Sequence, residues 1–488
     1  MSILDIIGIP KPPDRAVLNF LLRCCTKRTL ETSGGLNEGH DSSLKPSPCD
    51  SFQQLVAAFN TKRPLTAPAT DCLAAALAIS ISLRIPGPFL WSHLVGPSSS
   101  LKTTIAMVVG AAADKCFTVS EFTSLFSGST VGGKDNSIMP RLQGKMFIVK
   151  DLTPLLQAKA DVQNTVFGQL RDAYDGKTEK FFNNSVFLQY DGIRFSCLTC
   201  TTHAIYKFQR SDMGERFLAI RINSYWEEDG RLIKIDADPS AEGNAYDAFF
   251  NTVSSGLEDS SLRLDDLASV RSLAWGFINH LHDTMTDSTK GAQALSEAFK
   301  ADRTVKNLID SLAIWLEHAR CPKATTAEES SVRPEPAQLH RSVMQLSKAA
   351  MCLAVVLGHT GPSPEVVRIV KKWAFDTAFG FALEIMNYVA THPLVSLDMI
   401  AARLQLSKPG ANNWTAHLIS IGVLQTVLKP NNSGNRGRHS LCFELTPAFR
   451  IVADTIGLIP QRKNAVEAAL AANPLFGSPS LPSPLFGN

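Results

Sequence analysis

Apolar residues in the middle of the chain form short runs separated by polar turns. Five of these runs have the length of strands and cover residues 88–95, 115–119, 144–149, 195–200 and 217–222. Segments in which apolar residues recur with helical spacing lie before or between them, at residues 69–83, 103–112 and 161–174. Continuous apolar runs are typical of strands that are buried on both faces of a parallel sheet. The pattern therefore predicts an α/β fold for this part of the chain.

A β-hairpin is predicted between the third and fourth apolar runs. Its arms are residues 179–182 and 186–190, inside the segment 177–194. Asn183-Asn184 and Asp191-Gly192 supply residues that favour tight turns. The hairpin carries two lysines near its start, Lys177 and Lys180.

The second half of the chain reads as mostly helical. Helices are predicted within residues 245–320 and at 337–357 and 364–390, with a Thr/Ser/Pro-rich linker at 324–336. Two further helices, at 396–404 and 408–421, are followed by strand-like runs at 424–427 and 440–445. This order predicts a winged helix-turn-helix. Its wing tip, residues 429–439, contains Arg436 and Arg438 and suits contact with DNA phosphates, although many winged helices contact proteins instead.

The two ends of the chain have a different composition. A helix is predicted at residues 14–27, followed by a Ser/Gly/Pro-rich mobile loop at 32–50. The tail repeats Pro-Leu-Phe-Gly, at 474–477 and 484–487, in a segment whose composition predicts disorder. Such a repeat is typical of docking on a partner, and chance repetition in a biased segment is the alternative.

Composition narrows the class of protein. The chain has 488 residues, enough for two or three domains, and 44% of them are hydrophobic, as in globular proteins. The formal net charge of +3 does not by itself indicate nucleic-acid binding.

Ten scattered cysteines with one CxxC, Cys197 to Cys200, predict reduced thiols, and no secretory signal precedes them, so the protein is expected in the cytoplasm. The longest apolar segment, 73–85, predicts a buried helix and no membrane span.

The segment after the first strand resembles a phosphate-binding loop. Gly96, Lys102 and Thr103 fit the pattern Gly, four residues, Gly, Lys, Ser/Thr, whereas Leu101 occupies the position of the second glycine. Strand, loop and helix N-terminus in this order bring backbone N–H groups together on phosphates. The candidate nucleotide-binding residues are Gly96, Pro97, Ser98, Ser99, Ser100, Leu101, Lys102, Thr103 and Thr104. The alternative is a serine-rich turn that binds nothing.

Polar residues at the ends of later strands are candidates for the chemistry. Asp151 ends the run 144–149 after Lys150, and a carboxylate there can reach a metal-bound water. Thr201 and Thr202 end the run 195–200, where a hydroxyl can orient an attacking water. Arg216 precedes the last strand and can reach the γ-phosphate bound by a neighbouring subunit. The alternative for each of these residues is an ordinary polar residue at a strand end or on the surface.

Taken in order, these features resemble the AAA+ motor of the minichromosome maintenance (MCM) replicative helicases. They resemble more closely a group of phage- and mobile-element-associated ATPases with the same core, over roughly residues 69 to 450. We expect an N-terminal helical region, then the P-loop AAA+ core, helical lid and winged helix that the resemblance implies, and last a C-terminal helix with a disordered tail. These regions are residues 1–68, 69–244, 245–390, 391–455 and 456–488.

The resemblance also implies roles for single residues. Lys102 would bind the phosphates of ATP and Thr103 would bind Mg²⁺, and alanine is common in that family where this chain has Leu101. Thr202 or Thr201 would be the sensor at the strand end. Arg216 would be the finger that acts on a neighbour's nucleotide, and Arg341 would be the lid arginine that senses the γ-phosphate.

The same resemblance implies DNA contacts. Lys177 or Lys180 would present its charge to single-stranded DNA in a central channel, because the matching hairpin of such helicases enters that channel. Arg436 and Arg438 would contact DNA from the wing. The chain would act as a homo-oligomeric ring, expected to be a hexamer, with a replication protein bound to its tail.

One position departs from the helicase pattern, which ends its acid strand in Asp-Glu. This chain has Lys150-Asp151, followed by Leu152. In strict register Lys150 replaces the magnesium acid and Asp151 keeps the water-polarising position. If the register slips by one residue, Asp151 serves the metal and Leu152 occupies the position of the base.

The sequence therefore predicts an ATP- and Mg²⁺-dependent DNA helicase or translocase for the replication of a phage or mobile element. The alternative from another class is an ATP-gated DNA-binding switch or loader with little hydrolysis, which Lys150 favours. A third alternative is an ATPase that remodels a protein partner through its winged helix and tail.

Overall fold

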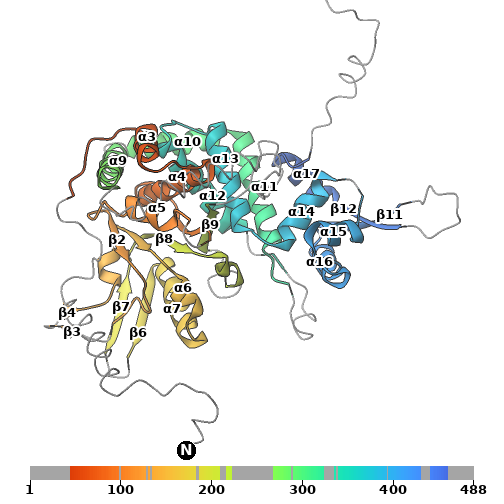
Figure 1. Cartoon of the computed structure of the whole chain (residues 1–488), viewed down its shortest axis with the longest axis horizontal. Helices are drawn as coiled ribbons and strands as arrows, with labels where there is room; N and C mark the ends of the chain where they lie inside the picture. Colours follow the sequence, from red (N-terminus) through yellow and green to blue (C-terminus); the bar gives the residue numbers. More distant parts are fainter. Residues whose placement is uncertain are drawn as a thin grey trace, which may run out of the picture.

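The computed structural model of the chain has an α/β core with a C-terminal helix–strand unit beside it (Figure 1). The structure describes residues 44–97, 100–127, 130–131, 134–182, 186–208, 216–222, 267–286, 289–323, 335–336, 339–392, 394–429 and 440–459. The helix predicted at 14–27, the turn Asn183-Asn184, the wing tip with Arg436 and Arg438, and the Pro-Leu-Phe-Gly tail lie outside the described residues.

The core is a five-stranded parallel sheet. Its strands are β1 (Trp91–Val95), β2 (Cys116–Val119), β5 (Met146–Val149), β8 (Ser196–Thr201) and β9 (Phe217–Arg221). They lie in the order β2-β5-β8-β1-β9, and each neighbouring pair is parallel. Each strand coincides with one of the five apolar runs, and β8 extends one residue beyond its run, so the predicted α/β fold with a buried parallel sheet is confirmed.

Side chains alternate between the two faces of this sheet, and each face has its own apolar core. Leu94, Ile148 and Ile220 belong to the core on one face, whereas Phe147 and Phe217 belong to the core on the other. Both faces are therefore covered, as expected for a parallel sheet whose crossover connections are helical.

Helices from both halves of the chain cover the first face (Figure 1). They are α3 (Phe52–Lys62), α4 (Ala67–Ile81), α5 (Lys102–Val109), α9 (Ala268–Thr286), α10 (Thr289–Ala301), α11 (Arg303–Ala319), α12 (Leu339–Val356), α13 (Pro364–Thr377) and α14 (Phe381–Thr391), with the 3-10 turn η1 (Ser82–Arg84) after α4. α12 packs on α4, and α13 packs on the edge strand β9. The helices after residue 267 thus share one apolar core with the helices that flank β1.

The second face carries α6 (Thr153–Gln157) and α7 (Ala160–Tyr174), with the 3-10 turns η2 (Met139–Leu142) and η3 (His203–Lys207). The predicted hairpin is present as β6 (Lys177–Phe181) and β7 (Phe187–Asp191), which pair antiparallel with Phe181 opposite Phe187. A smaller hairpin, β3 (Thr130–Val131) and β4 (Lys134–Asp135), is joined to it by a hydrogen bond from the Tyr190 hydroxyl to Asp135.

One predicted helix is wrong. The pattern predicted a continuous helix at 364–390, but the structure has α13 and α14 with a break between them. Gly380 lies at this break with a φ of 143°, a backbone conformation that glycine tolerates and L side chains avoid. The apolar periodicity continues across the break because both helices contribute to the same core.

The C-terminal unit contains β10 (Val395–Ser396), α15 (Leu397–Leu404), α16 (Lys408–Ser420), β11 (Leu424–Lys429), β12 (Ser440–Leu445) and α17 (Pro447–Thr455). Its three strands lie in the order β10-β12-β11 and are antiparallel. Gln405, with a φ of 54°, ends α15 and allows the short turn to α16. The helices and strands predicted for this segment are therefore present, and apolar residues such as Phe443 join the core of the first face.

The apolar segment predicted as a buried helix is α4. Among the described residues, Ala67–Arg84 is the segment long and apolar enough to cross a membrane by length and hydropathy. Most of it is buried in the protein, against α12 and the first face of the sheet, which is typical of a core helix. The cysteines of the described residues are all free thiols.

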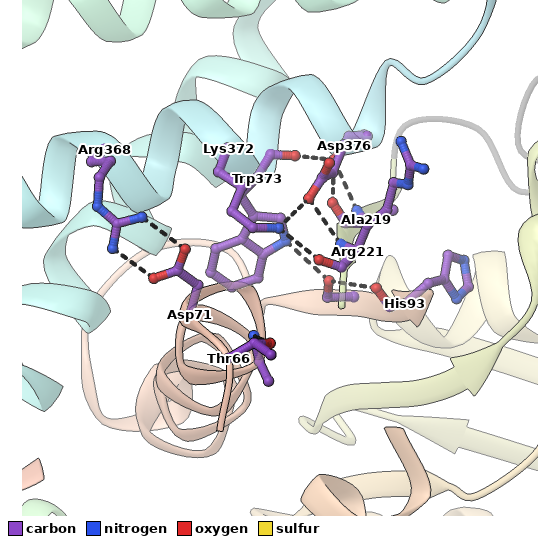
Figure 2. Close-up of polar contacts among 12 residues, drawn as sticks. Thr66, Asp71, His93, Ala219, Arg221, Arg368, Lys372, Trp373 and Asp376 are labelled. Carbon is purple, nitrogen blue, oxygen red and sulfur yellow. Dashed lines mark hydrogen bonds and ion pairs between the residues drawn. The ribbon is translucent and has the colours of Figure 1, made fainter. Parts of the chain in front are cut away.

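Polar side chains of α13 cover the outer edge of β9 (Figure 2). The N–H of Ala219 donates to Thr377 Oγ1 at 2.8 Å, and the N–H of Arg221 donates to Asp376 Oδ2 at 2.8 Å. Lys372 Nζ donates to the carbonyl oxygen of Arg221 at 2.7 Å and to Asp376 Oδ2 at 2.6 Å. These side chains occupy the hydrogen-bonding positions that a sixth strand would otherwise fill.

The same helix is tied to two other elements of the core (Figure 2). Arg368 forms a two-pronged ion pair with Asp71 of α4, with N–O distances of 2.8 and 2.6 Å. Trp373 Nε1 donates to Ser92 Oγ of β1 at 3.0 Å. α13 is therefore fixed to the strand that precedes the candidate nucleotide loop.

Replacing Asp376 by alanine is expected to reduce the free energy of unfolding by about 3–5 kcal/mol, because it leaves the buried Lys372 ammonium without its carboxylate. The double variant Lys372→Met/Asp376→Leu removes both charges and is expected to lose less. Urea denaturation of the three proteins measures this difference. Equal losses in the single and double variants would show that the ion pair does not account for the effect.

Candidate functional site

The carboxyl ends of the five parallel strands meet at one edge of the sheet, which we call the carboxyl edge; the opposite side is the amino edge. After β1 the chain moves to β2, returns through β5 and β8, and then passes over β1 to β9. The strand order thus reverses beside β1. In open α/β sheets, ligands bind outside the carboxyl ends of the strands at such a reversal. The segment after β1 therefore begins at the expected position for a ligand site.

Gly96 begins this segment and is enclosed by its neighbours. Its N–H donates to the carbonyl oxygen of Thr201, at the end of β8, at 3.2 Å. A Cβ atom at this position would lie 2.5 Å from Ile222 Cγ2 and 2.8 Å from Ser100 Oγ. Only glycine fits here without displacing a neighbour. Ser98 and Ser99 lie outside the described residues.

Lys102, the first residue of α5, turns its side chain back into the segment. Nζ donates to the carbonyl oxygen of Gly96 at 2.9 Å, to Ser100 Oγ at 3.0 Å, and to the carbonyl oxygen of Pro97. Burial lowers the pKa of Lys102, while Cys200 and Asp151 act in the opposite direction. A buried cation is thus held inside the curve of the loop by oxygen atoms of the loop itself.

The residues on either side of Lys102 differ in exposure. Leu101 is partly buried and packs against the core of the first face. Thr103 is exposed and Thr104 is partly exposed in the first turn of α5. A hydroxyl at Thr103 is therefore accessible at the carboxyl edge, as binding a hydrated metal ion requires.

Asp151 lies on the extension of β5. Its N–H donates to the carbonyl oxygen of Ser120, and its Oδ1 accepts from the N–H of Thr153 at 2.8 Å. Its carboxylate is solvent-exposed and is the one that raises the pKa of Lys102. Leu152, directly after it, is buried. Asp151 is thus the acidic group of this strand end that acts on the lysine of the loop.

The end of β8 contributes two threonines with different surroundings. Thr201 is buried, and its carbonyl oxygen holds Gly96. Thr202 is partly exposed, and its hydroxyl accepts from the N–H of Ala204 at 3.4 Å, which caps η3. Of the two candidate sensors, Thr202 therefore has the more accessible hydroxyl.

Two further groups near this edge were not assigned a role from the sequence. Arg221 ends β9 opposite Val95, and its guanidinium lies over the ring of Phe379 at 4.1 Å. His203 follows Thr202, and its pKa is lowered by burial and by the positive charges of Arg221 and Lys102. No local pattern marks Arg221, because the neighbour that orients it, Phe379, comes from the distant α13–α14 turn.

Arg216 lies at the amino edge. It precedes β9, whose first residue Phe217 is opposite Trp91 at the start of β1. Five strand residues at about 3.3 Å each separate this level from the loop, roughly 17 Å. Arg216 Nη2 pairs with Asp175 Oδ2 at 2.5 Å. Arg216 therefore does not reach the loop of its own chain.

Arg341 of α12 lies near Arg216. Burial raises the pKa of Tyr174, and the positive charges of Arg341 and Arg216 both act to lower it. Gln345, one turn after Arg341, donates to the Tyr174 hydroxyl at 3.3 Å and to the carbonyl oxygen of Arg216 at 2.9 Å. The two candidate arginines thus gather around Tyr174, on the side of the sheet opposite to Lys102.

The two candidate lysines lie on opposite faces of the hairpin β6–β7. Lys177 is exposed at the base, 3.8 Å from Glu179 Oε2 and opposite Asp191. Lys180 is nearer the tip, and its ammonium lies 5.1 Å from the ring centre of Phe182. Lys180 therefore has the less acidic surroundings and the more distal position.

No protein-family model matches the chain, and no curated protein matches it in sequence. At the carboxyl edge, the buried ammonium group of Lys102, the accessible hydroxyl of Thr103 and the carboxylate of Asp151 lie near the strand reversal. Within the described residues no three His, Cys, Asp or Glu side chains cluster as a protein-only metal site. Mg²⁺ does not require one, since it binds through one or two protein oxygens and substrate phosphates. Thr103 and Asp151 supply oxygens of this kind.

Gly96→Ala is expected to lower the free energy of unfolding by about 1–3 kcal/mol and to weaken nucleotide binding, because its Cβ displaces Ile222 and Ser100. Gly168→Ala is a matched control within α7, where a Cβ meets only Arg171 Nη2 at 3.8 Å. Thermal unfolding and titration with a fluorescent ATP analogue test both variants. Wild-type binding by Gly96→Ala would contradict the enclosed position of the loop.

Proposed function

We propose that the carboxyl edge binds and hydrolyses ATP, with the segment after β1 acting as a P-loop. The observation that carries this proposal is the Lys102 ammonium, held within the loop at the point where the strand order reverses. A phosphate group entering the loop would replace the carbonyl oxygens of Gly96 and Pro97 as the partner of this cation.

The other groups have complementary roles in this proposal. Thr103 and Asp151 would hold Mg²⁺, which neutralises charge on the phosphates when bound. Thr202 would orient the attacking water, and in the strict register Asp151 would polarise this water in place of holding the metal.

The positions of Arg216 and Arg341 favour a ring of subunits. Both lie at the amino edge, whereas Lys102 lies at the carboxyl edge. An arginine stabilises the transferring phosphoryl group only by direct contact. We infer that the two arginines serve the nucleotide of a neighbouring subunit, as in the ring, expected to be a hexamer, of the AAA+ helicases that the sequence resembles.

The proposed substrate is DNA. The hairpin β6–β7 extends from the second face and carries Lys180 toward its tip. The C-terminal unit, with α15, α16 and the β11–β12 pair, has the element order of a winged helix, in which α16 would be the recognition helix. Together they favour a helicase or translocase that couples ATP hydrolysis to movement along a single strand, in the replication of a phage or mobile element.

The test is ATP hydrolysis by gel-filtered protein with and without single-stranded DNA, with the oligomeric state determined in the same samples. A motor is expected to be a ring-sized oligomer whose hydrolysis is strongly stimulated by DNA. ATP binding without DNA-stimulated hydrolysis would favour the alternative, an ATP-gated DNA-binding switch or loader. The buried Leu152 favours that alternative, since it leaves Asp151 without a second carboxylate beside it.

A further inference from the structure

Three parts of the molecule meet at the amino edge around the end of α7. Tyr174 and Asp175 end this helix, directly before the first hairpin strand. Arg216 directly precedes β9, and Gln345 lies in α12. Gln345 bonds both Tyr174 and Arg216, so the hairpin, the candidate finger and the helix of Arg341 share one polar contact group.

Asp175 is built into the base of the hairpin. Its N–H donates to the carbonyl oxygen of Arg171 at 3.1 Å, which closes the last turn of α7. Gly176 follows with a φ of 90°, and its carbonyl oxygen accepts from the N–H of Gly192 at the end of the second hairpin arm, at 2.8 Å. Two residues thus join the helix to both arms of the hairpin. The carboxylate of Asp175 must move when the base of the hairpin moves.

The end of α7 also holds the side chain of Arg216. Its guanidinium pairs with Asp175 at 2.5 Å and lies 5.9 Å from the ring centre of Tyr174. The Arg216 side chain is 14% exposed and that of Asp175 is 51% exposed, so the pair reaches the surface on its carboxylate side. Gln345, in contrast, holds only the backbone oxygen of Arg216. The guanidinium can therefore change partners while its backbone stays fixed.

We propose that Asp175 is a positioning residue that links the hairpin to the nucleotide of the neighbouring subunit through Arg216. This inference rests on the proposed function. With a γ-phosphate in the adjacent site, the guanidinium is shared between that phosphate and Asp175. After hydrolysis and phosphate release it pairs with Asp175 alone, and the base of the hairpin changes its position. Each hydrolysis event would thus move a DNA-contacting hairpin in the subunit next to it.

The test compares Asp175→Asn with Asp114→Asn. Asp114 is a matched control because it is 48% exposed and pairs with Lys115 at 3.0 Å. It precedes β2, the outer strand of the sheet on the side opposite to β9. Asp175→Asn is expected to keep ATP binding while the stimulation of its hydrolysis by single-stranded DNA falls about fivefold or more. Asp114→Asn is expected to retain wild-type stimulation. Asp175→Glu keeps the carboxylate and is expected to retain most of the stimulation by single-stranded DNA.

Hydrogen exchange separates this role from a purely structural one. In the wild-type protein, a non-hydrolysable ATP analogue is expected to change amide exchange in β6 and β7, and in Asp175→Asn this change is expected to be absent. Retained stimulation and a retained exchange response in Asp175→Asn would overturn the inference while leaving the ATPase proposal intact. A wild-type protein without DNA-stimulated hydrolysis would overturn the proposed function, and the inference with it.

Discussion

Lys102→Ala is expected to reduce ATP hydrolysis by about a hundredfold or more and to weaken nucleotide binding. The side chain is buried, and its ammonium group is the positive charge held inside the loop, in contact with Gly96 and Ser100. Alanine leaves the phosphates without this cation in a site where charge is poorly screened. Steady-state hydrolysis and titration with a fluorescent ATP analogue measure the two effects.

Lys115→Ala is the control for this experiment. Lys115 is also a lysine next to a sheet strand, but it pairs with Asp114 at the amino end of β2 and has no contact with the loop. Its replacement is expected to leave hydrolysis unchanged. Wild-type turnover in Lys102→Ala would show that the segment after β1 is not the nucleotide site.

Arg216→Ala is expected to bind ATP normally and to hydrolyse it about a thousandfold more slowly or worse. The reason is its position at the amino edge, roughly 17 Å from the loop that would bind the nucleotide of the same chain. In the proposed ring, loss of the guanidinium would therefore affect the transition state in the neighbouring site without changing the groups that would bind ATP. Binding and single-turnover hydrolysis, measured on the same oligomer, separate the two steps.

Mixing two inactive variants tests whether this residue acts between subunits. In a mixed ring, a subunit with Arg216→Ala keeps Lys102, and an adjacent subunit with Lys102→Ala keeps Arg216. Some interfaces then contain both groups, and hydrolysis is expected to reappear on mixing. If the mixture stays inactive while both variants remain oligomeric, the arginine does not act across the interface.

Much of the core could be predicted because the relevant signals are local. The strands of the sheet are buried on both faces, so each appears in the sequence as a continuous apolar run. The hairpin combines strand-like arms with turn residues, and the segments of α15 and α16 are separated by a short turn at 405–407. Lys102 and Asp151 could be named as candidates because Lys102 fits a loop pattern after the first apolar run and Asp151 comes two residues after the third.

The parts that could not be predicted depend on contacts between distant residues. Asp175 pairs with Arg216, 41 residues away, and by itself it resembles any acidic residue at a helix end. Lys372 and Asp376 look like an ordinary surface pair four residues apart on a helix, yet they cover the edge of β9. The break at Gly380 was missed because both helices present apolar residues to one core.

Leu101 is the mismatch between this segment and the phosphate-loop pattern. The pattern asks for glycine at this position because the backbone approaches a phosphate closely. Here the side chain packs against the core of the first face. A sequence pattern records the residue type but not the direction in which its side chain points.

The cover that α13 gives to β9 also affects the newly synthesised chain. Asp376 is 155 residues after Arg221, so β9 leaves the ribosome about 8–30 s before the helix that covers it. During this interval the strand exposes unpaired backbone groups, which can template pairing with another chain. Ribosome-bound or truncated forms that end before α13 are therefore expected to aggregate through this edge. Chaperone binding during synthesis would protect the protein until α13 is made.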